Sequence, residues 1–406
     1  MTRLNISIDV ESDESVFIPY SRQNINAVDI EKVCEVLRSE FLTQGPVVPT
    51  FEKAVAEKFN AKCAVAVNSA TSALHIACLA LGVGPGDTVW TSPNTFVATA
   101  NCARYCGASV DFVDIDPRTW CMSVKDLQQK LEHHQAENLS LPKIVIPVHL
   151  SGQSCNMQSI YELGQQYGFR IIEDASHAIG GSFQKAPVGS CLYSDITVFS
   201  FHPVKIITTG EGGMALTNDK KLADHMARLR THGITRDSKQ LTHEPDGPWY
   251  YEQLELGFNY RMTEMQAAVG KAQLAKLDAM LTANDDRYLV LEQQLQGHIE
   301  FREQPEGSRS TNDAFIFFEP NTAVRDEMVQ LLQASGFGTK NLPGAVEWHC
   351  AAFWDHALDE DQLKRSQRTK ELLETTVAIP IWLNKTVSDY SQLAGSLAEL
   401  CANPKA

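Results

Sequence analysis

The feature that most constrains the fold is a series of short apolar segments that alternate with helix-like segments between about residues 60 and 230. Segments such as 72–81, 124–131 and 157–167 carry apolar residues at the spacing of one helix face. The predicted strands between them are residues 64–67, 87–91, 110–114, 144–149, 170–174, 196–201 and 213–217. Strands that are apolar along their whole length are buried on both faces. We therefore expect an α/β domain with a mainly parallel, seven-stranded sheet covered by helices on both sides.

A different pattern follows residue 237. Residues 237–248 are polar and rich in breakers, which is typical of a loop or linker. The later segments with helical spacing are 263–281, 287–295, 323–334 and 390–402, and the strand-like ones are 314–318 and 377–381. The chain of 406 residues has room for two domains. We expect a large α/β domain over residues 1–245 and a smaller α+β domain over residues 246–406.

The net charge of −15 and the pI near 5.3 bear on possible partners. A chain this acidic is a poor candidate for binding the phosphate backbone of nucleic acids, and no basic helix-turn-helix segment occurs. The first 15 residues lack the apolar core of a signal peptide, and no run approaches about 18 apolar residues. We expect a cytoplasmic protein that binds neither nucleic acid nor membranes.

The ten cysteines are scattered along the chain, and no CxxC pair occurs. Zinc sites and the disulfide frameworks of small secreted domains usually show short, regular cysteine spacings. We therefore expect reduced thiols and no metal site.

A stretch of small polar residues, NSATS at 68–72, follows the first predicted strand and begins the first predicted helix. Small residues at this point let a phosphate reach the N–H groups of the first helical turn, which have no partner inside the helix. The alternative is plain N-capping by Ser or Thr, which is the simpler explanation for this segment alone. The stretch matches neither GxxxxGK[ST] nor GxGxxG.

Glu173 and Asp174 lie at the end of a predicted strand, and His177 follows shortly after. Ligands of open parallel sheets gather at the carboxyl ends of strands. Two adjacent carboxylates are costly to bury without partners, so one of them could pair with a protonated ring nitrogen. Taken alone, Asp174 is better explained as a cap of the next segment and His177 as a hydrogen-bonded structural residue.

Lys205 lies in SFHPVKIITTGEGG, residues 200–213, after an apolar strand and before a Gly-rich turn. A lysine held near apolar groups or other cations keeps part of its amine unprotonated and available as a nucleophile. The Gly-rich turn permits close backbone approach. From this segment alone, a solvent-exposed loop lysine is the simpler explanation.

Together, the three segments meet the requirements of one cofactor. Pyridoxal phosphate needs a phosphate site, an acid beside its ring nitrogen and a lysine that binds its aldehyde. The chain provides them in that order at strand ends, and Asp174 and Lys205 are 31 residues apart, about one β-α-β step. The sequence therefore predicts a pyridoxal-phosphate enzyme. A generic α/β enzyme without this cofactor would require the matches to be accidental.

Five longer segments are similar to those of the DegT/DnrJ/EryC1/StrS family of sugar aminotransferases. They are NSATSALHIACLALGVGPGD, SPNTFVATANCARYCGASVDFVDID, IIEDASHAIGG, SFHPVKIITTGEGG and GFNYRMTEMQAAVG. The resemblance implies the aspartate-aminotransferase type of fold, fold type I. The segments IPYSRQNI, FLTQGP and AVAVNSATSALHIACLALG most resemble the branch of pseudaminic acid biosynthesis. That branch aminates carbon 4 of a UDP-linked 4-keto-6-deoxy amino sugar, with glutamate as donor.

The resemblance also assigns roles to residues. It implies that Lys205 binds the cofactor covalently and acts as general base, and that Asp174 pairs with the ring nitrogen. It implies that Phe96 stacks on the ring, with a core phenylalanine as the competing explanation. The other implied cofactor contacts are Ala70, Thr71 and Ser200 at the phosphate, Asn259 at the phosphate of a neighbouring subunit, and His177 near the ring oxygen, where the family often has Gln. The contact through Asn259 implies a homodimer with composite active sites.

The resemblance places Thr43, Tyr260 and Arg261 around the substrate. Arg261 can hold a carboxylate or diphosphate with two hydrogen bonds, and a surface or interface ion pair is an equal alternative. Residues 341–358 depart from the pseudaminic acid branch. Their Trp348 and His349 could stack on a sugar or base, or belong to a packed core element. This departure leaves the identity of the keto sugar open.

We therefore expect an aminotransferase that moves the amino group of L-glutamate to a keto group, at carbon 4, of a nucleotide-linked keto-deoxy sugar for surface polysaccharide or glycan biosynthesis. One alternative is an aminotransferase acting on a keto sugar acid of lipopolysaccharide. A sugar dehydratase of the same family is disfavoured, because those relatives replace the lysine with histidine. A cofactor-binding regulatory protein is the alternative outside enzymes.

Overall fold

A seven-stranded sheet organises the larger part of the molecule in the computed structural model, which describes residues 21–339 and 366–402. Its strands, in spatial order, are β1 (Cys63–Val67), β9 (Gly213–Thr217), β8 (Ile196–Ser200), β5 (Arg170–Asp174), β4 (Ile144–Ile146), β2 (Thr88–Thr91) and β3 (Ser109–Phe112). Only β9 runs antiparallel to its neighbours in this sheet. The predicted mainly parallel α/β sheet of seven strands is thus confirmed, with β4 three residues shorter than expected.

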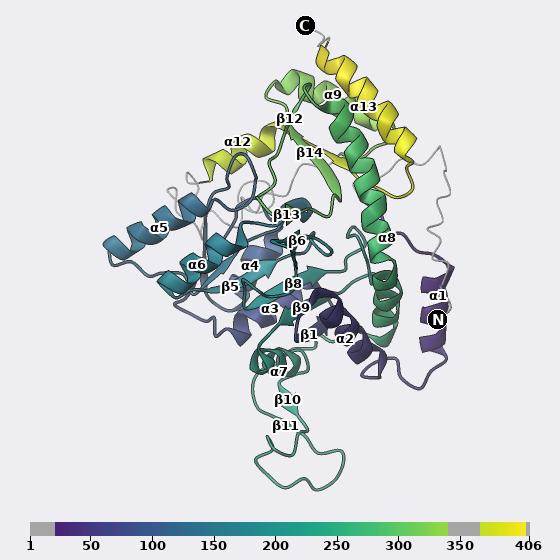
Figure 1. Cartoon of the computed structure of the whole chain (residues 1–406). Helices are drawn as coiled ribbons and strands as arrows, with labels where there is room; N and C mark the ends of the chain where they lie inside the picture. Colours follow the sequence, from purple (N-terminus) through teal and green to yellow (C-terminus); the bar gives the residue numbers. More distant parts are fainter. Residues whose placement is uncertain (1–20, 340–365, 403–406) are drawn as a thin grey trace.

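Helices cover both faces of this sheet (Figure 1). The helices of the larger part are α2 (Val47–Phe59), α3 (Ala70–Ala80), α4 (Val97–Tyr105), α5 (Val124–Ala136), α6 (Met157–Tyr167) and α7 (Lys220–Leu229). Alternate strand residues reach opposite cores, because successive side chains of a strand point to opposite faces. Ile172 packs with α3, α4 and α7, whereas Ile171 packs with α5 and α6. A strand that is apolar along its whole length therefore contributes to the hydrophobic core on each face of the sheet.

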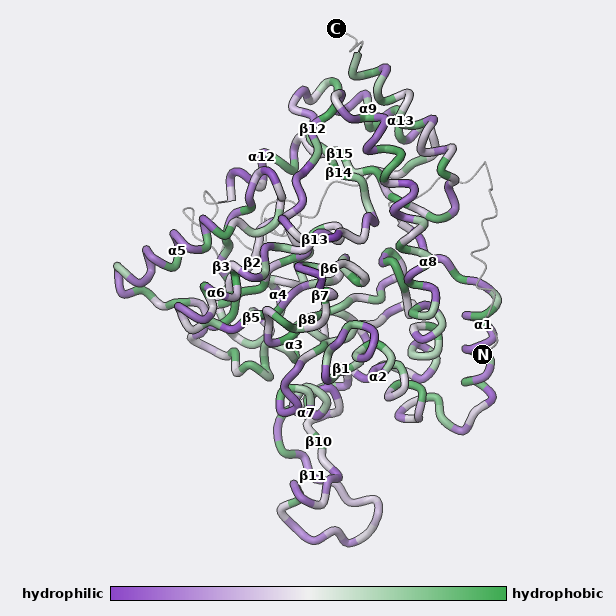
Figure 2. The backbone as a smooth tube through the Cα atoms, in the orientation of Figure 1, coloured by the Kyte–Doolittle hydropathy of each residue, from purple (hydrophilic) through white to green (hydrophobic). Residues whose placement is uncertain are grey.

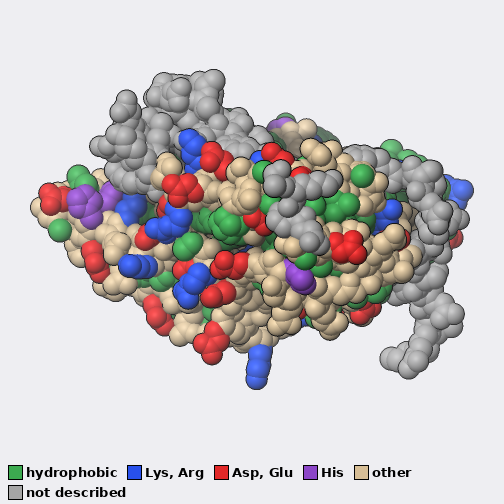
Figure 3. All heavy atoms as spheres, turned by 90° about the horizontal axis from the view of Figure 1, so that it is seen from above, with side chains coloured by type: hydrophobic (Ala, Val, Ile, Leu, Met, Phe, Trp, Pro, Cys, Tyr) green, Lys and Arg blue, Asp and Glu red, His purple; other side chains and the backbone are tan. Residues whose placement is uncertain are grey.

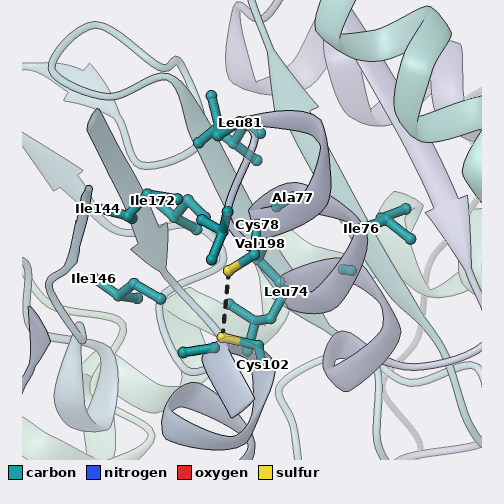
Figure 4. Close-up of a cluster of buried hydrophobic side chains, with 14 of the residues drawn as sticks. Leu74, Ile76, Ala77, Cys78, Leu81, Cys102, Ile144, Ile146, Ile172 and Val198 are labelled. Atoms are coloured by element: carbon teal, nitrogen blue, oxygen red, sulfur yellow. Dashed lines mark hydrogen bonds between the residues drawn. The ribbon is translucent and has the colours of Figure 1, made fainter. Parts of the chain in front are cut away.

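The core between the sheet and α3 is shown in close-up in Figure 4. Leu74 and Cys78 of α3 lie against Ile172 and Val198 of the strands. The Cys78 thiol donates to the Cys102 sulfur at 3.6 Å. All nine cysteines of the described residues are free thiols, and Cys350 lies outside those residues. Six of these nine are buried and act as small apolar core residues.

A second, antiparallel sheet forms the centre of the smaller part. It consists of β12 (Glu300–Phe301), β14 (Ala314–Phe318) and β15 (Thr376–Pro380). The helices α9 (Thr322–Ala334) and α13 (Val387–Ala402) share its core, and α12 (Gln367–Thr375) precedes β15. This arrangement agrees with the α+β pattern of the sequence. The boundary at residues 245 and 246 remains a prediction.

The long helix α8 (Glu264–Leu295) connects the two parts (Figure 1). The prediction of two helices, 263–281 and 287–295, is wrong because the chain continues as one helix. Asn284 and Arg287 interrupt the apolar spacing, but both are buried and hydrogen-bonded to backbone carbonyls outside the helix. Tertiary contacts thus satisfy the polar residues that suggested a break.

The remaining elements are short. They are α1 (Ala27–Leu37), the 3-10 turn η1 (Leu150–Gly152), β6 (Ser182–Phe183), β7 (Ala186–Pro187), β13 (Ser308–Arg309) and the hairpin of β10 (Ile234–Thr235) and β11 (Glu252–Gln253). The hairpin projects from the body of the molecule in Figure 1 and contains the predicted loop 237–248. Within the described ranges, no helix has both the length and the apolar character needed to cross a membrane.

The distribution of polar residues follows the layers. In Figure 2, the backbone is hydrophobic along much of the central sheet, whereas α5 at the periphery is largely hydrophilic. Figure 3 shows acidic and basic side chains interspersed over the described part of one face. Charges of both signs are therefore mixed on the described part of that face.

Candidate active site

A pocket of about 300 Å³ lies at the carboxyl ends of the parallel strands. Its walls come from the starts of α3 and α4, the ends of β5 and β8, and the loop that follows β8. Seven of the predicted cofactor-binding residues line it, namely Ala70, Thr71, Phe96, Asp174, His177, Ser200 and Lys205. Residues from sequence positions more than 130 apart therefore meet in one cavity. Small-molecule sites are typically pockets of this kind at strand ends.

The start of α3 forms one end of the pocket. Ser69 is the N-cap, and its hydroxyl accepts from the N–H of Ser72 at 3.1 Å, so the capping explanation also holds. Ala70 and Thr71 are the first residues of the helix and line the pocket. A helix start carries partial positive charge and N–H groups without intrahelical partners. This end of the pocket therefore suits an anion such as a phosphate.

Gly213 lets β9 pass very close to this helix start. A Cβ atom at position 213 would lie 2.6 Å from the backbone nitrogen of Ala70 and the carbonyl carbon of Ser69. Ser200, the last residue of β8, is paired with Gly213 and lines the pocket. The glycine is thus required by close packing of β9 against α3.

The carboxylate of Asp174 is held at the pocket wall by two donors. The Thr99 hydroxyl donates to Oδ2 at 2.7 Å, and the N–H of Ser176 donates to Oδ1 at 3.2 Å. The residue is buried at the end of β5. The local bond to Ser176 agrees with a capping role, but Thr99 lies on α4 and fixes the carboxylate toward the pocket. Sequence reasoning missed Thr99, since a single threonine inside a helix carries no distinctive signal.

Lys205 lies in the loop between β8 and β9 and is half-buried. Its N–H donates to the carbonyl of His202 at 2.9 Å. The loop closes on itself, since the N–H of Thr209 and the hydroxyl of Thr208 both donate to the carbonyl of Phe201, at 3.0 and 2.9 Å. Lys205 is thus not a fully exposed loop lysine but lines the pocket, and its role at the cofactor stays a prediction.

Phe96 and His177 both line the pocket. Phe96 precedes α4 and is 63% exposed, so the competing explanation of a core phenylalanine is wrong. An aromatic ring this exposed inside a pocket offers a flat surface for stacking. The Nδ1 of His177 accepts from the N–H of Ser151 at 3.1 Å, and its carbonyl accepts from Thr311.

The other predicted residues do not line this pocket. Thr43 and Asn259 are exposed on the surface. Tyr260 is hydrogen-bonded to His75 at 3.1 Å and stacks on Phe258. Arg261 borders a separate hollow of about 190 Å³. Trp348 and His349 lie outside the described residues.

Sequence reasoning also missed a buried pair beside the pocket. His149 lines the pocket, and its Nε2 lies 2.8 Å from Oε2 of Glu173. The only signal in the sequence was that Glu173 precedes Asp174 at a strand end. Among the described residues, no cluster of three or more His, Cys, Asp or Glu side chains could hold a metal ion.

The residues present fit pyridoxal phosphate. The pocket combines the positive start of α3, an exposed aromatic ring, a carboxylate oriented by Thr99 and a half-buried lysine. Together with the mainly parallel seven-stranded sheet, these features define a pyridoxal-phosphate-dependent enzyme of fold type I.

The chain belongs to the DegT/DnrJ/EryC1/StrS aminotransferase family, whose sequence model matches residues 23–398. It is therefore a pyridoxal-phosphate-dependent sugar aminotransferase. The predicted family, fold class, enzyme class and cofactor are confirmed.

Two curated relatives are similar over most of their length. Spore coat polysaccharide biosynthesis protein SpsC of Bacillus subtilis is 40% identical over 286 residues, which are 70% of this chain and 71% of that protein. The UDP-4-amino-4,6-dideoxy-N-acetyl-beta-L-altrosamine transaminase of Campylobacter jejuni is 36% identical over 328 residues, 80% of this chain and 82% of that enzyme.

Solved structures agree with the fold. A DegT DnrJ EryC1 StrS aminotransferase from Brucella abortus has a TM-score of 0.81 at 26% identity, covering 92% of this chain and 95% of that one. PseC of Helicobacter pylori, an aminotransferase of pseudaminic acid biosynthesis, has a TM-score of 0.81 at 24% identity, covering 96% and 100%. The latter likeness bears on the fold alone.

Proposed function

We propose that this protein transfers the amino group of L-glutamate to the carbon-4 keto group of a nucleotide-linked keto-deoxy sugar. The reaction takes place in the cytoplasm and serves surface polysaccharide or glycan biosynthesis. The names of the relatives support this proposal, since one belongs to spore coat polysaccharide biosynthesis and another is a transaminase of a UDP-linked dideoxy amino sugar. The observation that carries it is the meeting of seven predicted residues in one pocket.

The residues of the pocket divide the work. Lys205 would hold the cofactor through its aldehyde, and its amine would act as the base that takes the proton from the α-carbon of the amino donor. Asp174 would pair with the ring nitrogen, and Phe96 would offer its face to the ring with His177 in the same pocket. When bound, the cofactor supplies the electron sink that makes the α-proton acidic. Proton transfer by a positioned base usually contributes about 10²–10⁴-fold to the rate.

The cofactor phosphate and the sugar nucleotide are bound by different parts of the chain. The start of α3 with Ala70, Thr71 and Ser200 binds the cofactor phosphate, and Asn259 reaches it from the second subunit of a homodimer. The sugar nucleotide contacts Thr43, Tyr260, Arg261, Trp348 and His349. The domain of residues 1–245 provides the cofactor pocket, and residues 246–406 form the smaller domain, which includes Asn259.

Replacing Lys205 with alanine tests the catalytic assignment. We expect Lys205→Ala to lose the visible absorbance band of the covalently bound cofactor and to lower glutamate-dependent formation of 2-oxoglutarate by at least about 10²-fold. The matched control is Lys220→Ala, because Lys220 is an exposed lysine that pairs only with Asp224 among the described residues. Substantial glutamate turnover in Lys205→Ala would overturn the assignment.

A panel of acceptors tests the substrate. The purified protein is first treated with glutamate, so that the bound cofactor carries the amino group. It is then mixed with nucleotide-linked keto sugars or with keto sugar acids. Amination of a UDP-linked 4-keto-6-deoxy sugar supports the proposal, whereas reaction with keto sugar acids alone favours the lipopolysaccharide alternative. Loss of a sugar hydroxyl without amine transfer would indicate a dehydratase, and an absorbance spectrum unchanged by glutamate would indicate a regulatory protein.

A further inference from the structure

A buried cluster of hydrogen bonds surrounds the carboxylate of Glu173, next to the pocket. Its Oε2 lies 2.8 Å from Nε2 of His149. Its Oε1 accepts from the hydroxyl of Ser194 at 2.5 Å and from that of Thr197 at 3.0 Å. Glu173 is buried, and His149 has no exposed surface. Carboxylates in such surroundings are rarely left without several donors.

The contacts of His149 fix its protonation state. Its Nδ1 accepts a hydrogen bond from the backbone N–H of Cys155 at 3.2 Å, so that nitrogen carries no proton. The proton of the neutral ring is then on Nε2 and is donated to Glu173. With Nδ1 as acceptor and Nε2 as donor, the hydrogen bonds describe a ring with one proton, so that the His149–Glu173 pair carries the single negative charge of the carboxylate.

The ionised form of Glu173 is favoured by these same donors. Burial alone would raise the pKa of Glu173, but the hydrogen bond and the electrostatic attraction of His149, together with the hydrogen bonds from Ser194 and Thr197, outweigh burial and hold this pKa below its usual range. A carboxylate that accepts several hydrogen bonds stays charged at neutral pH.

The pair is connected directly to Asp174. Glu173 and Asp174 are consecutive residues of β5, so their side chains point to opposite faces of the sheet. The backbone N–H of His149 donates to the carbonyl of Asp174 at 3.0 Å. His149 also lines the pocket itself. The negative charge of Glu173 thus lies on the residue that precedes Asp174, the acid that lines the pocket.

We propose that His149 and Glu173 form a positioning pair whose fixed negative charge acts through Asp174 to favour a cofactor ring that is protonated on its nitrogen. The inference rests on the proposed role of Asp174 at the ring nitrogen. Glu173 would be the second of two carboxylates that stabilise the positive charge on the ring. A unit charge on the order of 10 Å away, at an effective dielectric constant of about 20, changes an equilibrium constant roughly tenfold.

The test compares two cofactors on the full chain. One is pyridoxal phosphate, and the other is its analogue in which a carbon replaces the ring nitrogen, so that no positive charge can form there. Affinity is measured by fluorescence titration of the apoprotein for wild type, Glu173→Gln and Asp174→Asn. Glutamine keeps the shape of Glu173 and removes its charge. We expect Glu173→Gln to bind pyridoxal phosphate about five- to tenfold more weakly, with less than about a twofold change for the analogue.

Two further variants separate the effect of the lost charge from a general loss of structure. Glu264→Gln removes another buried carboxylate, which accepts from the N–H groups of Val47 and Val48 away from the pocket, and should weaken neither cofactor selectively. If Glu173→Gln does not fold, Glu173→Met provides a second neutral variant, since apolar residues can replace buried ions.

Each outcome has a distinct meaning. Equal weakening of both cofactors in the Glu173 variants, or no weakening of either, would overturn the inference and leave the pair a structural one. If Asp174→Asn itself does not discriminate between the cofactors, the proposed role of Asp174 fails first. Selective loss in both Asp174→Asn and Glu173→Gln supports the inference.

Discussion

The carboxylates near the pocket are held in contrasting ways. The carboxylate of Asp174 accepts hydrogen bonds from a hydroxyl and a backbone N–H, and that of Glu173 accepts hydrogen bonds from three side chains. Asp313 differs, because its Oδ1 is buried and has no hydrogen-bond partner among the described residues. Burial raises the pKa of Asp313 to about 6, against the lowering effects of Lys205 and Arg302. A carboxyl with one unsatisfied oxygen, subject to the charge of Lys205, therefore has a pKa not far below neutral pH.

Asp313 is expected to make stability depend on pH. Its pKa in the folded chain, about 6, lies above the value of about 3.9 expected when unfolded. The folded state therefore binds more protons between these values, and stability falls as pH rises from about 4 to 6. Asp313→Asn removes this loss. We expect the stability of the variant relative to wild type to rise by about 1 to 3 kcal/mol between pH 4.5 and 7.5.

Urea unfolding of the apoproteins at the two pH values measures this difference, and comparison with wild type cancels the titration of all other groups. A relative stability that does not vary with pH, or that varies in the opposite direction, would contradict the pKa given to Asp313.

Single residues differ in how well the sequence predicts them. Lys205, Asp174 and Ala70 lie at the ends of strands or within five residues of them, so strand periodicity and the requirements of one cofactor predicted them together. Thr99 and His149 reach the site through tertiary packing, and their sequence neighbours give no sign of it. Phe96 had a competing explanation in the sequence, a core phenylalanine, and only its exposure in the structure excludes that explanation.

Among the elements, β9 links the lysine loop to the start of α3. Its first residue, Gly213, pairs with Ser200 of β8 on one side and with Val67 of β1 on the other. A side chain larger than hydrogen would collide with Ser69 and Ala70. The position of the predicted phosphate site therefore depends on one glycine.

We expect Gly213→Ala to push β9 away from the start of α3. Overpacking of this kind usually costs about 1 to 3 kcal/mol of stability, and the affinity for pyridoxal phosphate should fall as well. The control is Gly84→Ala, because nothing lies within 4 Å of a Cβ atom at that position. Thermal unfolding and fluorescence titration report both effects. An alanine variant with wild-type cofactor affinity would show that the helix start can shift without consequence.

Elements were predicted well where the apolar pattern is simple. All seven strands of the large sheet were located because their residues are buried on both faces. The helix α8 was divided in two because Asn284 and Arg287 are polar, and the carbonyls that satisfy them come from distant segments. Such partners cannot be read from local sequence.

At the scale of the whole molecule, several exposed apolar side chains suggest where a second chain would bind. Trp249, Tyr251 and Leu256 lie on or beside the projecting hairpin and are 70%, 51% and 80% exposed. Asn259 follows them and is also exposed. Exposed apolar patches of this kind mark interaction surfaces, which supports the proposed homodimer with composite sites.

Mixed dimers test the composite site. Co-expressed Lys205→Ala and Asn259→Ala chains should regain about a quarter of wild-type activity, since half of the dimers are mixed and one of their two sites is intact. The measurement is the glutamate-dependent change of the visible absorbance band, at a cofactor concentration too low for Asn259→Ala alone. If the mixture is no more active than the sum of its parents, each site is built from one chain.

The single antiparallel strand also has a consequence for biosynthesis. The edge strand β1 is bonded in the large sheet only to β9, and Cys63 pairs with Thr217 across more than 150 residues of chain. A nascent chain that has emerged only as far as β8 therefore lacks the strand that pairs with β1 in the large sheet. We expect the pocket to close late during translation, after β9 has left the ribosome, because such distant pairings form slowly.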